Sequence, residues 1–518
     1  MSWLTGLVSA FGLSPSASAS SYSDQSETRH RGASRTLRSM ASWWARRGDA
    51  AADASAYERG TLRDRCRDAY RNESIARAVV NRCRNSIVGT GLMANPDVDA
   101  DALGLTKEQA KAYNSQIRRN YLMWADSPLE CDIEGIEDFY GLQAMTLVSP
   151  MVSGDVLVST PMVSRGVYDL KCQLIESDRV SNPAGKINSA SLVDGVSLAP
   201  GGMPVGYHVD KQHPGSEHYT GPNHAYLAAF DQSGRRRVML VHDDRDRPGT
   251  VRGVPYLAPI LEPLRKVGKL TQAELTAAVV SSMMTVFIEK DAERLGANDV
   301  PLGPTCEPIE DDTPQNIEMG EGSILDLAPG EKANMAHPVR PNAQFAPFFN
   351  AICEQIGAAL NVPKSEILLV YEQSYTAARA AMLQAWRFFT MRRWRLVVHF
   401  CQPMYALQLD EQVARGMITL PGYSDPIKRR AWQRCIWNGP ARGAMDELKE
   451  AQAAEKRIQI GVSNEAIEAM QMTGEDRDSI HAQRVVEVDE RKADGTYAEQ
   501  FPKALETADK SPEVTTDE

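Results

Sequence analysis

The sequence lacks the cysteine pattern that zinc sites and disulfide-rich proteins require. Its eight cysteines are scattered singly along 518 residues, and no C-x-x-C pair occurs. Metal knuckles and disulfide frameworks place cysteines in pairs at short spacings. The scattered pattern therefore favours reduced thiols in a cytosol-like compartment.

Long hydrophobic runs are also missing. The longest charge-free apolar stretch, residues 275–288, is shorter than the ~20 residues that a bilayer-spanning helix needs. The N-terminal stretch MSWLTGLVSAFGLSPSASAS has an apolar centre like that of a signal peptide, but no basic residue precedes Arg29. A secretory signal carries its positive charge ahead of the apolar centre. We therefore expect neither secretion nor a membrane partner.

Familiar catalytic motifs are absent. The chain contains no G-x-x-x-x-G-K-[ST], no H-E-x-x-H and no G-x-S-x-G, which excludes the P-loop, zincin and nucleophile-elbow enzymes. HDDRD (242–246) comes closest to a metal site, because clustered carboxylates can hold two metal ions. Arg245 and Arg247 interrupt this cluster. We expect no enzyme, cofactor or metal, and keep a metal-dependent DNA-processing enzyme as the alternative.

Acidic residues are missing from one segment of this acidic protein, whose net charge is −11. Residues 374–400, SYTAARAAMLQAWRFFTMRRWRLVVHF, carry five arginines together with tryptophan and phenylalanine. At 100° per residue Arg379 and Arg393 fall inside its apolar stripe, while Phe388 falls outside it. Buried guanidinium groups are costly unless they are paired. The segment is therefore a core helix with partners on other elements, a subunit contact or a surface that faces nucleic acid.

Charge is distributed unevenly along the chain. Residues 1–72 hold eleven arginines against seven acids, a net charge of +4. Residues 286–342 hold twelve acids against four bases, and residues 441–518 hold nineteen against ten. A basic arm and two acidic modules thus flank a balanced body. The Ser- and Arg-rich arm is expected to be disordered.

The order of periodic segments indicates an α+β protein. Helical patterns over residues 72–89, 106–127 and 136–154 precede several short strand-like runs that Gly, Pro, Asn and Asp separate. Asn72 is the expected N-cap of the first helix and Gly89 its stop. A long helix is expected over 256–284, a β-rich acidic excursion over 286–342, a second helix over 343–362, and charged helices after Asp425.

Several stretches, in chain order, resemble the lambda-type portal proteins of tailed bacteriophages. These are RDRCRDAYRNESIARAVVNRCRNSIVGTGLMANP, DFYGLQAMTLVSPMVSGDVLV, CQLIESDRVSNP, RPGTVRGVPYLAPIL, LAPGEKANMAHPVRPNAQFAPFF and SYTAARAAMLQAWR. Two pieces depart from the family pattern: MVSGD (151–155) stands where an Arg and Gly-Glu are frequent, and LLVYEQSYTAAR (368–379) is a looser version of an Asp- and Ser-rich loop.

The resemblance implies the portal fold, with an α/β wing, a two-helix stem, a small β-rich clip, a long wing helix and an α-helical crown. The implied parts are a disordered basic arm (1–55), the wing (56–255), a stem helix (256–285), the clip (286–342), a second stem helix (343–362), the tunnel loop (363–376), the long wing helix (377–424), the helical crown (425–490) and an acidic flexible tail (491–518).

The resemblance also implies residue roles. Candidates that face DNA in the channel are Lys266, Lys269, Lys364, Ser374, Tyr375 and Arg379. Candidates for the contact between subunits are Arg387, Phe388, Arg392, Arg393, Trp394 and Arg395. Candidates for docking terminase and then adaptor proteins are the clip acids Glu307, Glu310, Asp311, Asp312, Glu318 and Glu321.

The implied function is a ring, a dodecamer in the family, at one vertex of the virion capsid. It would conduct double-stranded DNA during packaging and ejection after assembly in the bacterial cytoplasm. Its partners would be further copies of itself, the terminase large subunit, the major capsid or scaffold protein, and neck or head-completion proteins. A non-ring scaffolding protein is the remaining alternative.

Overall fold

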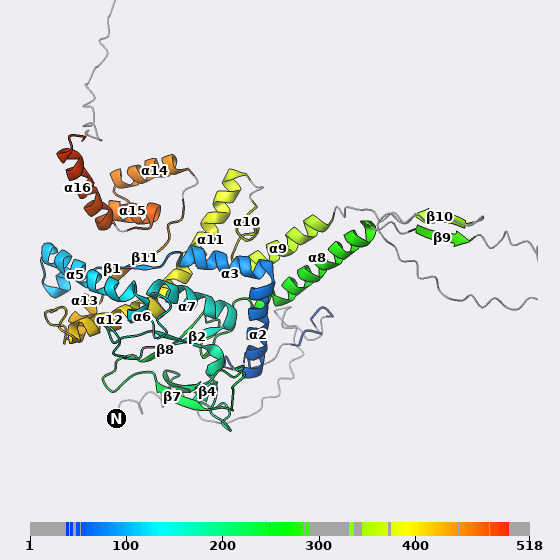
Figure 1. Ribbon diagram of the computed structural model, residues 1–518, viewed down its shortest axis with the longest axis horizontal. Helices are drawn as coiled ribbons and strands as arrows, with labels where there is room; N and C mark the ends of the chain where they lie inside the picture. Colours follow the sequence, from blue (N-terminus) through cyan, green and yellow to red (C-terminus); the bar gives the residue numbers. More distant parts are fainter. Residues whose placement is uncertain are drawn as a thin grey trace, which may run out of the picture. The chain divides into compact units, whose positions relative to one another are not determined.

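The structure is a computed structural model that divides into two compact units, Met1–Asp49 and Ala50–Glu518. All helices and strands named below belong to the second unit (Figure 1). The structure describes residues 38–40, 42–44, 48–51, 53–243, 245–282, 286–290, 331–335, 344–370, 374–443, 446–475 and 477–496.

Helices dominate the first part of this unit, and their ends follow local capping. Ser55 caps α2 by accepting a hydrogen bond from the amide of Glu58, whose carboxylate accepts one from Ser55 in return. Thr106 and Gln109 form the same box at the start of α5. The helices here are α2 (Ala56–Asn72), α3 (Ser74–Ile87), α4 (Ala100–Leu103), α5 (Lys107–Ala125), α6 (Pro128–Cys131) and α7 (Phe139–Ser153).

One predicted cap is wrong. Asn72 is the last residue of α2, and its side chain donates a hydrogen bond to Asp68 over 2.6 Å. Glu73 occupies the N-cap position of α3 without a side-chain cap. Helix α3 therefore starts one residue later than expected, because Asn72 belongs to the last turn of α2. The predicted stop at Gly89 is confirmed, with a φ of 58° just after the end of α3.

Two antiparallel sheets follow, as the alternating runs predicted. One has the strand order β3-β2-β8 and the other β4-β5-β6-β7. Leu157, Ile175, Val196 and Tyr207 are among the buried residues that share a small core between them. The strands are β2 (Asp155–Ser159), β3 (Gln173–Glu176), β4 (Leu192–Val193), β5 (Val196–Leu198), β6 (Pro204–Asp210), β7 (His224–Ala228) and β8 (Val238–His242).

A buried ion-pair network joins α2, β2 and the segment that leads into α8. Arg252 makes two hydrogen bonds to the Asp155 carboxylate, over 2.7 and 3.0 Å, and both side chains are at most 3% exposed. Arg252 also donates to the carbonyl groups of Val180 and Asp194. Burial alone would raise the pKa of Asp155, but Arg252, Ser177 and Arg63 lower it to about 2. The network therefore holds strand β2 against the segment that leads into α8.

The larger core is aromatic and lies where α5 and α7 pack against the last long helices. Phe139 stacks on Phe400 with ring centroids 5.4 Å apart and lies 5.0 Å from Trp124. Tyr121 and Tyr405 join them. Three consecutive elements supply the far side of this core: α11 (Tyr375–Leu396), a π-helical turn η5 (Val397–Cys401) and α12 (Gln402–Ala414).

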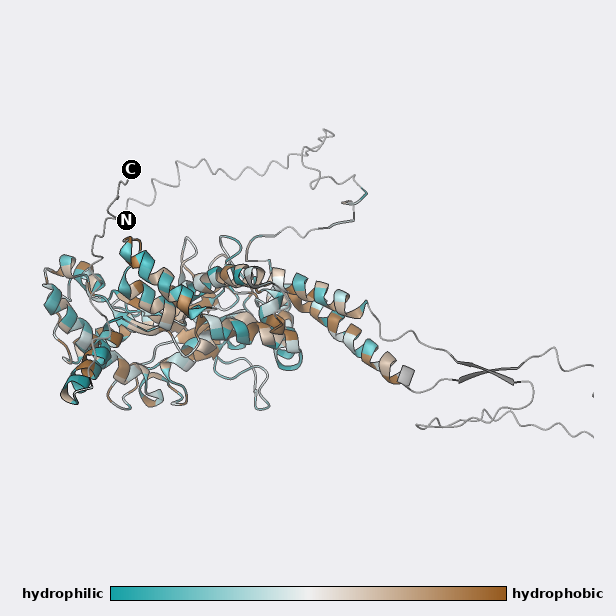
Figure 2. Cartoon of the chain, turned by 90° about the horizontal axis from the view of Figure 1, so that it is seen from above, coloured by the Kyte–Doolittle hydropathy of each residue, from teal (hydrophilic) through white to brown (hydrophobic). Residues whose placement is uncertain are grey.

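A pair of helices leads to and from a short antiparallel ladder, as predicted for the two helices and the excursion between them. The 3-10 turn η3 (Ala258–Ile260) opens α8 (Leu261–Ser282), and α9 (Phe345–Ala359) lies beside α8 (Figures 1 and 2). Strand β9 (Val286–Lys290) pairs with β10 (Glu331–Met335). The short helix α10 (Lys364–Leu368) follows α9.

The C-terminal part is less purely helical than predicted. A helix was expected to continue through Trp437, but α13 ends at Trp432 and β11 (Cys435–Asn438) pairs with β1 (Met93–Pro96), which the sequence analysis did not foresee. This partner lies more than 300 positions away, so local periodicity carries no sign of it. The helices are α13 (Pro426–Trp432), α14 (Glu447–Gln459), α15 (Glu465–Thr473) and α16 (Arg477–Ala493). No helix in the described ranges has both the length and the apolar content to cross a bilayer.

Candidate functional site

The cationic aromatic segment folds as α11 and η5, and its arginines find partners within the same chain. Arg392 is 3% exposed and forms an ion pair with Asp243. Its guanidinium lies 4.0 Å from the centroid of the Tyr256 ring and 5.1 Å from that of Phe388. Burial lowers the pKa of Arg392 to about 10, and nearby Arg395 contributes. Arg392 therefore clamps α11 to the strand end after β8 and to the start of the α8 segment.

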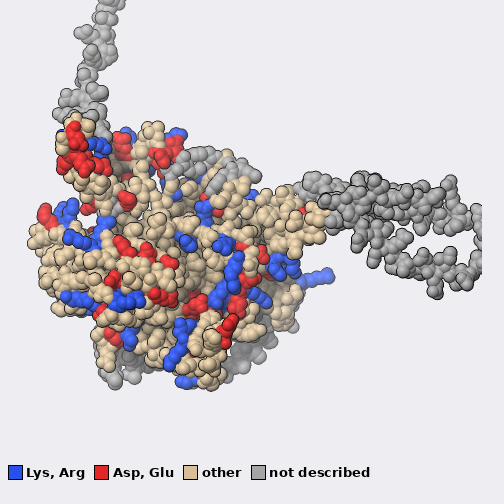
Figure 3. Space-filling view, in the orientation of Figure 1, with Lys and Arg blue, Asp and Glu red and all other residues tan. Residues whose placement is uncertain are grey.

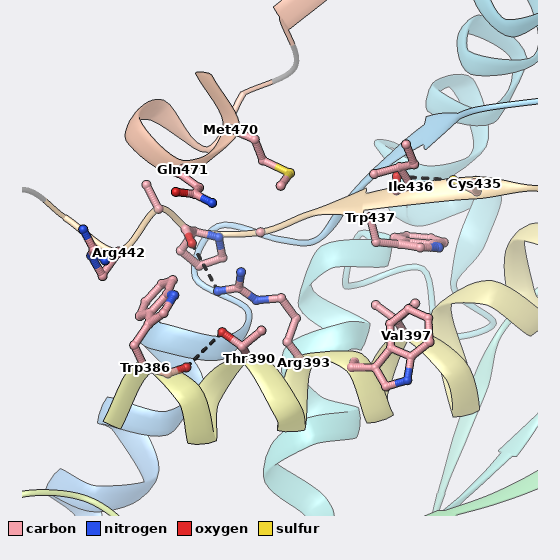
Figure 4. A pocket seen from close by; sticks show the side chains of 14 residues that line it. Trp386, Thr390, Arg393, Val397, Cys435, Ile436, Trp437, Arg442, Met470 and Gln471 are labelled. Atoms are coloured by element: carbon pink, nitrogen blue, oxygen red, sulfur yellow. Dashed lines mark hydrogen bonds between the residues drawn. The ribbon is translucent and has the colours of Figure 1, made fainter. Parts of the chain in front are cut away.

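Arg393 binds backbone rather than acids. It donates hydrogen bonds to the carbonyl groups of Ile87 and Ser86, over 3.0 and 2.9 Å, and to that of Pro440 over 3.1 Å. The first two carbonyls belong to the last turn of α3, where unpaired oxygens and the helix dipole favour a cation. Figure 4 shows Arg393 crossing from α11 toward the segment after β11.

Two of the six residues expected at a subunit contact remain on the surface. Arg387 is exposed, and the Trp394 side chain is 67% exposed. Arg395, by contrast, donates to the backbone oxygen of Asp243 over 2.9 Å, and Phe388 stacks on Tyr256. Of the six residues expected at a subunit contact, Arg392, Arg393, Arg395 and Phe388 thus hold the helix in its own chain, while Arg387 and Trp394 stay available to a neighbour.

Trp394 lies at an apolar surface that we call the Trp394 groove. A cavity of 460 Å³ is lined by residues of α11, β11 and α15. A second cavity, of 1010 Å³, is lined by residues of η5, α12 and α13. Both cavities are lined by Trp394, Val397 and Cys435. Figure 4 shows the first of them, with Val397 and Cys435 labelled. The groove consists of Trp394, Val397, Val398, Ile427, Cys435 and Ile436, of which Trp394, Val398, Ile427 and Ile436 are exposed.

Replacing Arg392 with lysine is expected to lower the free energy of unfolding by about 2 kcal/mol. Lysine keeps the charge but loses the flat guanidinium that stacks on Tyr256 and Phe388 while it bonds Asp243. Denaturant unfolding of the purified protein measures the change. Arg387→Lys on the exposed face of the same helix is the control, with an expected change within about 0.5 kcal/mol. Equal stability of the two variants would contradict the clamp.

The candidates for facing DNA are spread over α8, α10 and α11. Lys266 pairs with Glu262 over 2.6 Å, and Lys364 pairs with Glu354 over 2.9 Å. Lys269 is exposed. Ser374 is the N-cap of α11 and accepts a hydrogen bond from the amide of Ala377.

The remaining DNA candidates lie at the start of α11. Tyr375 is its first residue, and Arg379 lies 3.9 Å from the carboxylate of Glu450 in α14. Within the described ranges no hydrogen bond or ion pair joins any two of the six candidates, so their common role stays a prediction. The clip acids Glu307, Glu310, Asp311, Asp312, Glu318 and Glu321 lie outside the described residues.

Acidic and basic side chains are mixed over most of the face seen in Figure 3, with acidic residues more concentrated around α16. That helix carries Asp478, Glu487, Asp489 and Glu490. The same helix also carries Arg477, Arg484, Arg491 and Lys492, so its charges balance, and the acidic C-terminal module stays a prediction.

The described residues of the HDDRD cluster do not form a group of metal ligands. The Asp243 carboxylate is taken by Arg392, and the Nδ1–H of His242 donates to the backbone oxygen of Asp243 over 2.7 Å. In the same cluster, Asp244 lies outside the described residues. The ion pair with Arg392 balances the charge of the Asp243 carboxylate, which weakens its attraction for a divalent cation.

One other group, Glu176, Asp178 and His213, brings three potential metal ligands within 4.8 Å of one another. Asp178 is occupied by Arg63 and Arg67, over 2.9 and 2.6 Å. The Nδ1 of His213 accepts a hydrogen bond from Gly215, so a neutral ring carries its proton on Nε2. That nitrogen lies 3.0 Å from a carboxylate oxygen of Glu176 but forms no hydrogen bond with a described residue. The two arginines on Asp178 already balance its charge, which weakens the case for a metal ion here.

Sequence reasoning missed two features of this site. Ile427 and Ile436 join Trp394 in the groove from segments that were expected to be uniformly charged and helical. Arg252 stands within the quoted RPGTVRGVP stretch, but nothing in the sequence marks it as the centre of a buried network. Its position just before Gly253 and Pro255 suggests a turn, but it does not indicate that the side chain is buried.

Comparisons with known proteins agree with one another. The model of the family "Phage portal protein, lambda family" matches residues 36–393, more than half of the chain. Portal protein B of Escherichia phage lambda is 24% identical over 451 residues, which cover 83% of this chain and 84% of that protein. The portal protein of Escherichia phage N15 is 25% identical over 459 residues and 85% of each chain.

A solved structure of the neck of an empty GTA particle, computed with C6 symmetry, contains a chain that is 12% identical, with a TM-score of 0.46 over 78% of this chain and 92% of that one. The family match rests on the sequence and covers both the sheets and the helix α11 up to Arg393. The chain therefore belongs to the lambda family of phage portal proteins, whose role is structural rather than catalytic.

Proposed function

We propose that this portal protein closes into a ring of identical copies, a dodecamer, at one vertex of the capsid and that duplex DNA passes through the ring during packaging and ejection. Family membership supports the role, and the exposed Trp394 groove is the observation that carries the ring contact. A ring needs a heterologous contact in which one face of each copy meets a different face of the next. An exposed tryptophan in an apolar groove suits such a contact.

The parts of the proposed portal follow the elements of the chain. The wing comprises 56–255 and the stem comprises 256–285 and 343–362, whose helices α8 and α9 lie together. The clip comprises 286–342, which begins and ends near the β9–β10 ladder. The tunnel loop (363–376), the long wing helix (377–424) and the crown (425–490) complete the ring. Two of the expected bounds need correction, because α12 ends at Ala414 and α16 continues to Ala493, past the expected start of the C-terminal tail at 491.

DNA must slide through this ring without being gripped. Each phosphate that a protein neutralises releases counterions and strengthens non-specific binding. The net charge of −11 suits passage, and so does the fact that Lys266 and Lys364 are each paired with a glutamate. Lys269 and Arg379 would then make only weak, transient contacts with the backbone.

The remaining partners dock outside the channel in this proposal. The acidic clip would receive the terminase large subunit during packaging and neck or head-completion proteins afterwards, through Glu307, Glu310, Asp311, Asp312, Glu318 and Glu321. The wing would contact the major capsid or scaffold protein. The assembled particle would then be the site of action, after synthesis in the bacterial cytoplasm.

Negative-stain microscopy of the purified full-length protein tests the ring. We expect closed annuli of one dominant copy number with a central hole that admits B-form DNA. Only solitary particles, or rings too narrow for a duplex, would refute the proposal. Incubation with Mg²⁺ or Mn²⁺ and duplex DNA should leave the DNA intact; cleavage that Asp243→Ala abolishes would instead support the DNA-processing enzyme.

A further inference from the structure

A second cavity, separate from the Trp394 groove, lies where β8 meets η5 and has a volume of 390 Å³. We call it the β8 pocket. One wall is basic and the other is apolar. The basic side chains are Arg236, His242, Arg245, Arg395 and His399, and the apolar wall includes Met203, Pro204, Tyr207 and Phe230.

The basic wall has no acid of its own. None of the described residues that line the β8 pocket is acidic. Arg236 and Arg245 are exposed and form no ion pair with a carboxylate of the described residues. Arg236 lies over the ring of Phe230, 5.6 Å from its centroid. The nearby carboxylates of Asp243 and Asp155 are occupied by Arg392 and Arg252.

Burial and the same group of cations lower the pKa values of the His242 and His399 side chains. Burial lowers the pKa of His399, and Arg395, His242, Arg236 and Arg245 lower it further. Burial and then Arg245 lower the pKa of His242 as well. Both rings are therefore held neutral while guanidinium groups surround them. The one N–H of neutral His242 already donates to the backbone oxygen of Asp243, so of the two rings His399 is the one that can offer a donor to a ligand.

A buried donor lies beside the pocket. Arg392 lines an adjoining cavity of 30 Å³ that shares His242, Arg395 and His399 with the β8 pocket. Its Nη1 has no hydrogen-bond partner among the described residues, although the side chain is 3% exposed. An unpartnered buried donor is costly, so an acceptor that reaches this end of the pocket would gain a ready partner.

We propose that the β8 pocket binds a phosphoryl group, either free inorganic phosphate or a phosphodiester of the DNA backbone. Guanidinium groups match the oxygens of a phosphoryl group in pairs. Free inorganic phosphate carries about −1.5 to −2 charges near neutral pH, and each phosphodiester of the DNA backbone carries one. The two exposed arginines, which form no ion pair with a described carboxylate, offer such paired contacts to either form. The apolar wall beside them accommodates the organic part of an ester.

The β8 pocket consists of residues of a single chain, so this proposal does not depend on ring closure. Its failure and the failure of the ring would be seen separately: one in a binding measurement, the other in the microscope. If a DNA phosphodiester is the occupant, the pocket adds a defined contact on the wing to the weak contacts proposed for the channel.

Calorimetric titration of the full-length protein with inorganic phosphate, and separately with a duplex oligonucleotide, tests the proposal. The variant Arg236→Gln/Arg245→Gln removes both exposed cations and should weaken binding by about tenfold or more, since charge-assisted contacts are lost. Arg237→Gln is the matched control, because Arg237 is also exposed and adjacent in sequence but does not line the pocket.

The results of these titrations distinguish free phosphate from the DNA backbone as the occupant of the β8 pocket. Saturable phosphate binding that the double variant weakens identifies free phosphate, and a loss seen only with the duplex identifies the DNA backbone. Equal losses in the double variant and in Arg237→Gln would show general charge attraction and overturn the proposal. Tighter binding of succinate than of phosphate would also overturn it, because it would assign the pocket to carboxylates.

Discussion

Replacing Arg252 with methionine should lower the free energy of unfolding by about 3 to 5 kcal/mol, the cost of removing one partner of a buried ion pair. The Asp155 carboxylate would remain buried with its principal cation gone, and the carbonyl groups of Val180 and Asp194 would lose their donor. Thermal and denaturant unfolding of the wild-type and variant proteins measure the difference.

Arg247→Met is the matched control, since Arg247 lies five positions earlier and forms an exposed ion pair with Asp53. Exposed pairs contribute about 0 to 1 kcal/mol. The double variant Arg252→Met/Asp155→Leu should be more stable than Arg252→Met, because it no longer buries an unpaired charge. A loss below about 1 kcal/mol in the single variant would mean that water or another cation reaches Asp155 and that the network is not closed.

Replacing Trp394 with glutamate should leave the protomer folded but prevent the proposed ring. The side chain is 67% exposed in the single chain, so its loss removes little internal packing. In a ring it would lie at a contact where a buried tryptophan is worth about 2 to 4 kcal/mol, and the glutamate would bring a charge into an apolar groove. Mass photometry or sedimentation velocity should show the mass fall from ring to single chains.

The matching control is Ile187→Glu, which changes an apolar side chain that is 85% exposed in the sheet region. It should assemble like the wild-type protein. Both variants should keep the wild-type melting temperature of the isolated protomer. Rings of normal copy number formed by the Trp394 variant would exclude the groove as the contact, while leaving family membership untouched.

Much of the fold could be predicted because it is encoded locally. The stop at Gly89 and the short strand-like runs separated by Gly, Pro, Asn and Asp are short-range signals, and the structure confirms the stop and the strands. The pairing of β1 with β11 could not be predicted, since it joins segments more than 300 residues apart. The end of α13 at Trp432 depends on that pairing, so the error in the helix followed from the missing strand.

The arginines of α11 show a different limit. Their number and the absence of acids predicted that partners must come from elsewhere, and this is confirmed for four of them, Arg379, Arg392, Arg393 and Arg395. The identity of those partners was out of reach, because Arg393 and Arg395 bind backbone oxygens, which every residue possesses. Arg392 lies off the apolar stripe yet is 3% exposed, because Tyr256 and Phe388 cover it from a second side.

The candidate site also could not be predicted in full, because its residues come from segments that are far apart in the sequence. Trp394 was a candidate from the outset, but Ile427 and Ile436 complete the groove only once α13 and β11 are in place. The β8 pocket likewise gathers Arg245 and His399 from segments over 150 positions apart. The sequence shows which chemical groups a chain carries. Which of those groups lie close together in space is known only from the fold.

The π-helical turn Val397–Cys401 sets a phase difference between the two halves of the long helical rod. A π-turn takes up one residue more than an α-turn, and at 3.6 residues per turn that residue rotates everything after it by about 100°. Trp394 can therefore point outward on one side of the turn while Tyr405 and Met404, on the other, point into the core. Deleting a single residue at this turn should let the rod become a regular α-helix while the tryptophan and the tyrosine keep their sides, because the deletion removes the same ~100° that the π-turn absorbs.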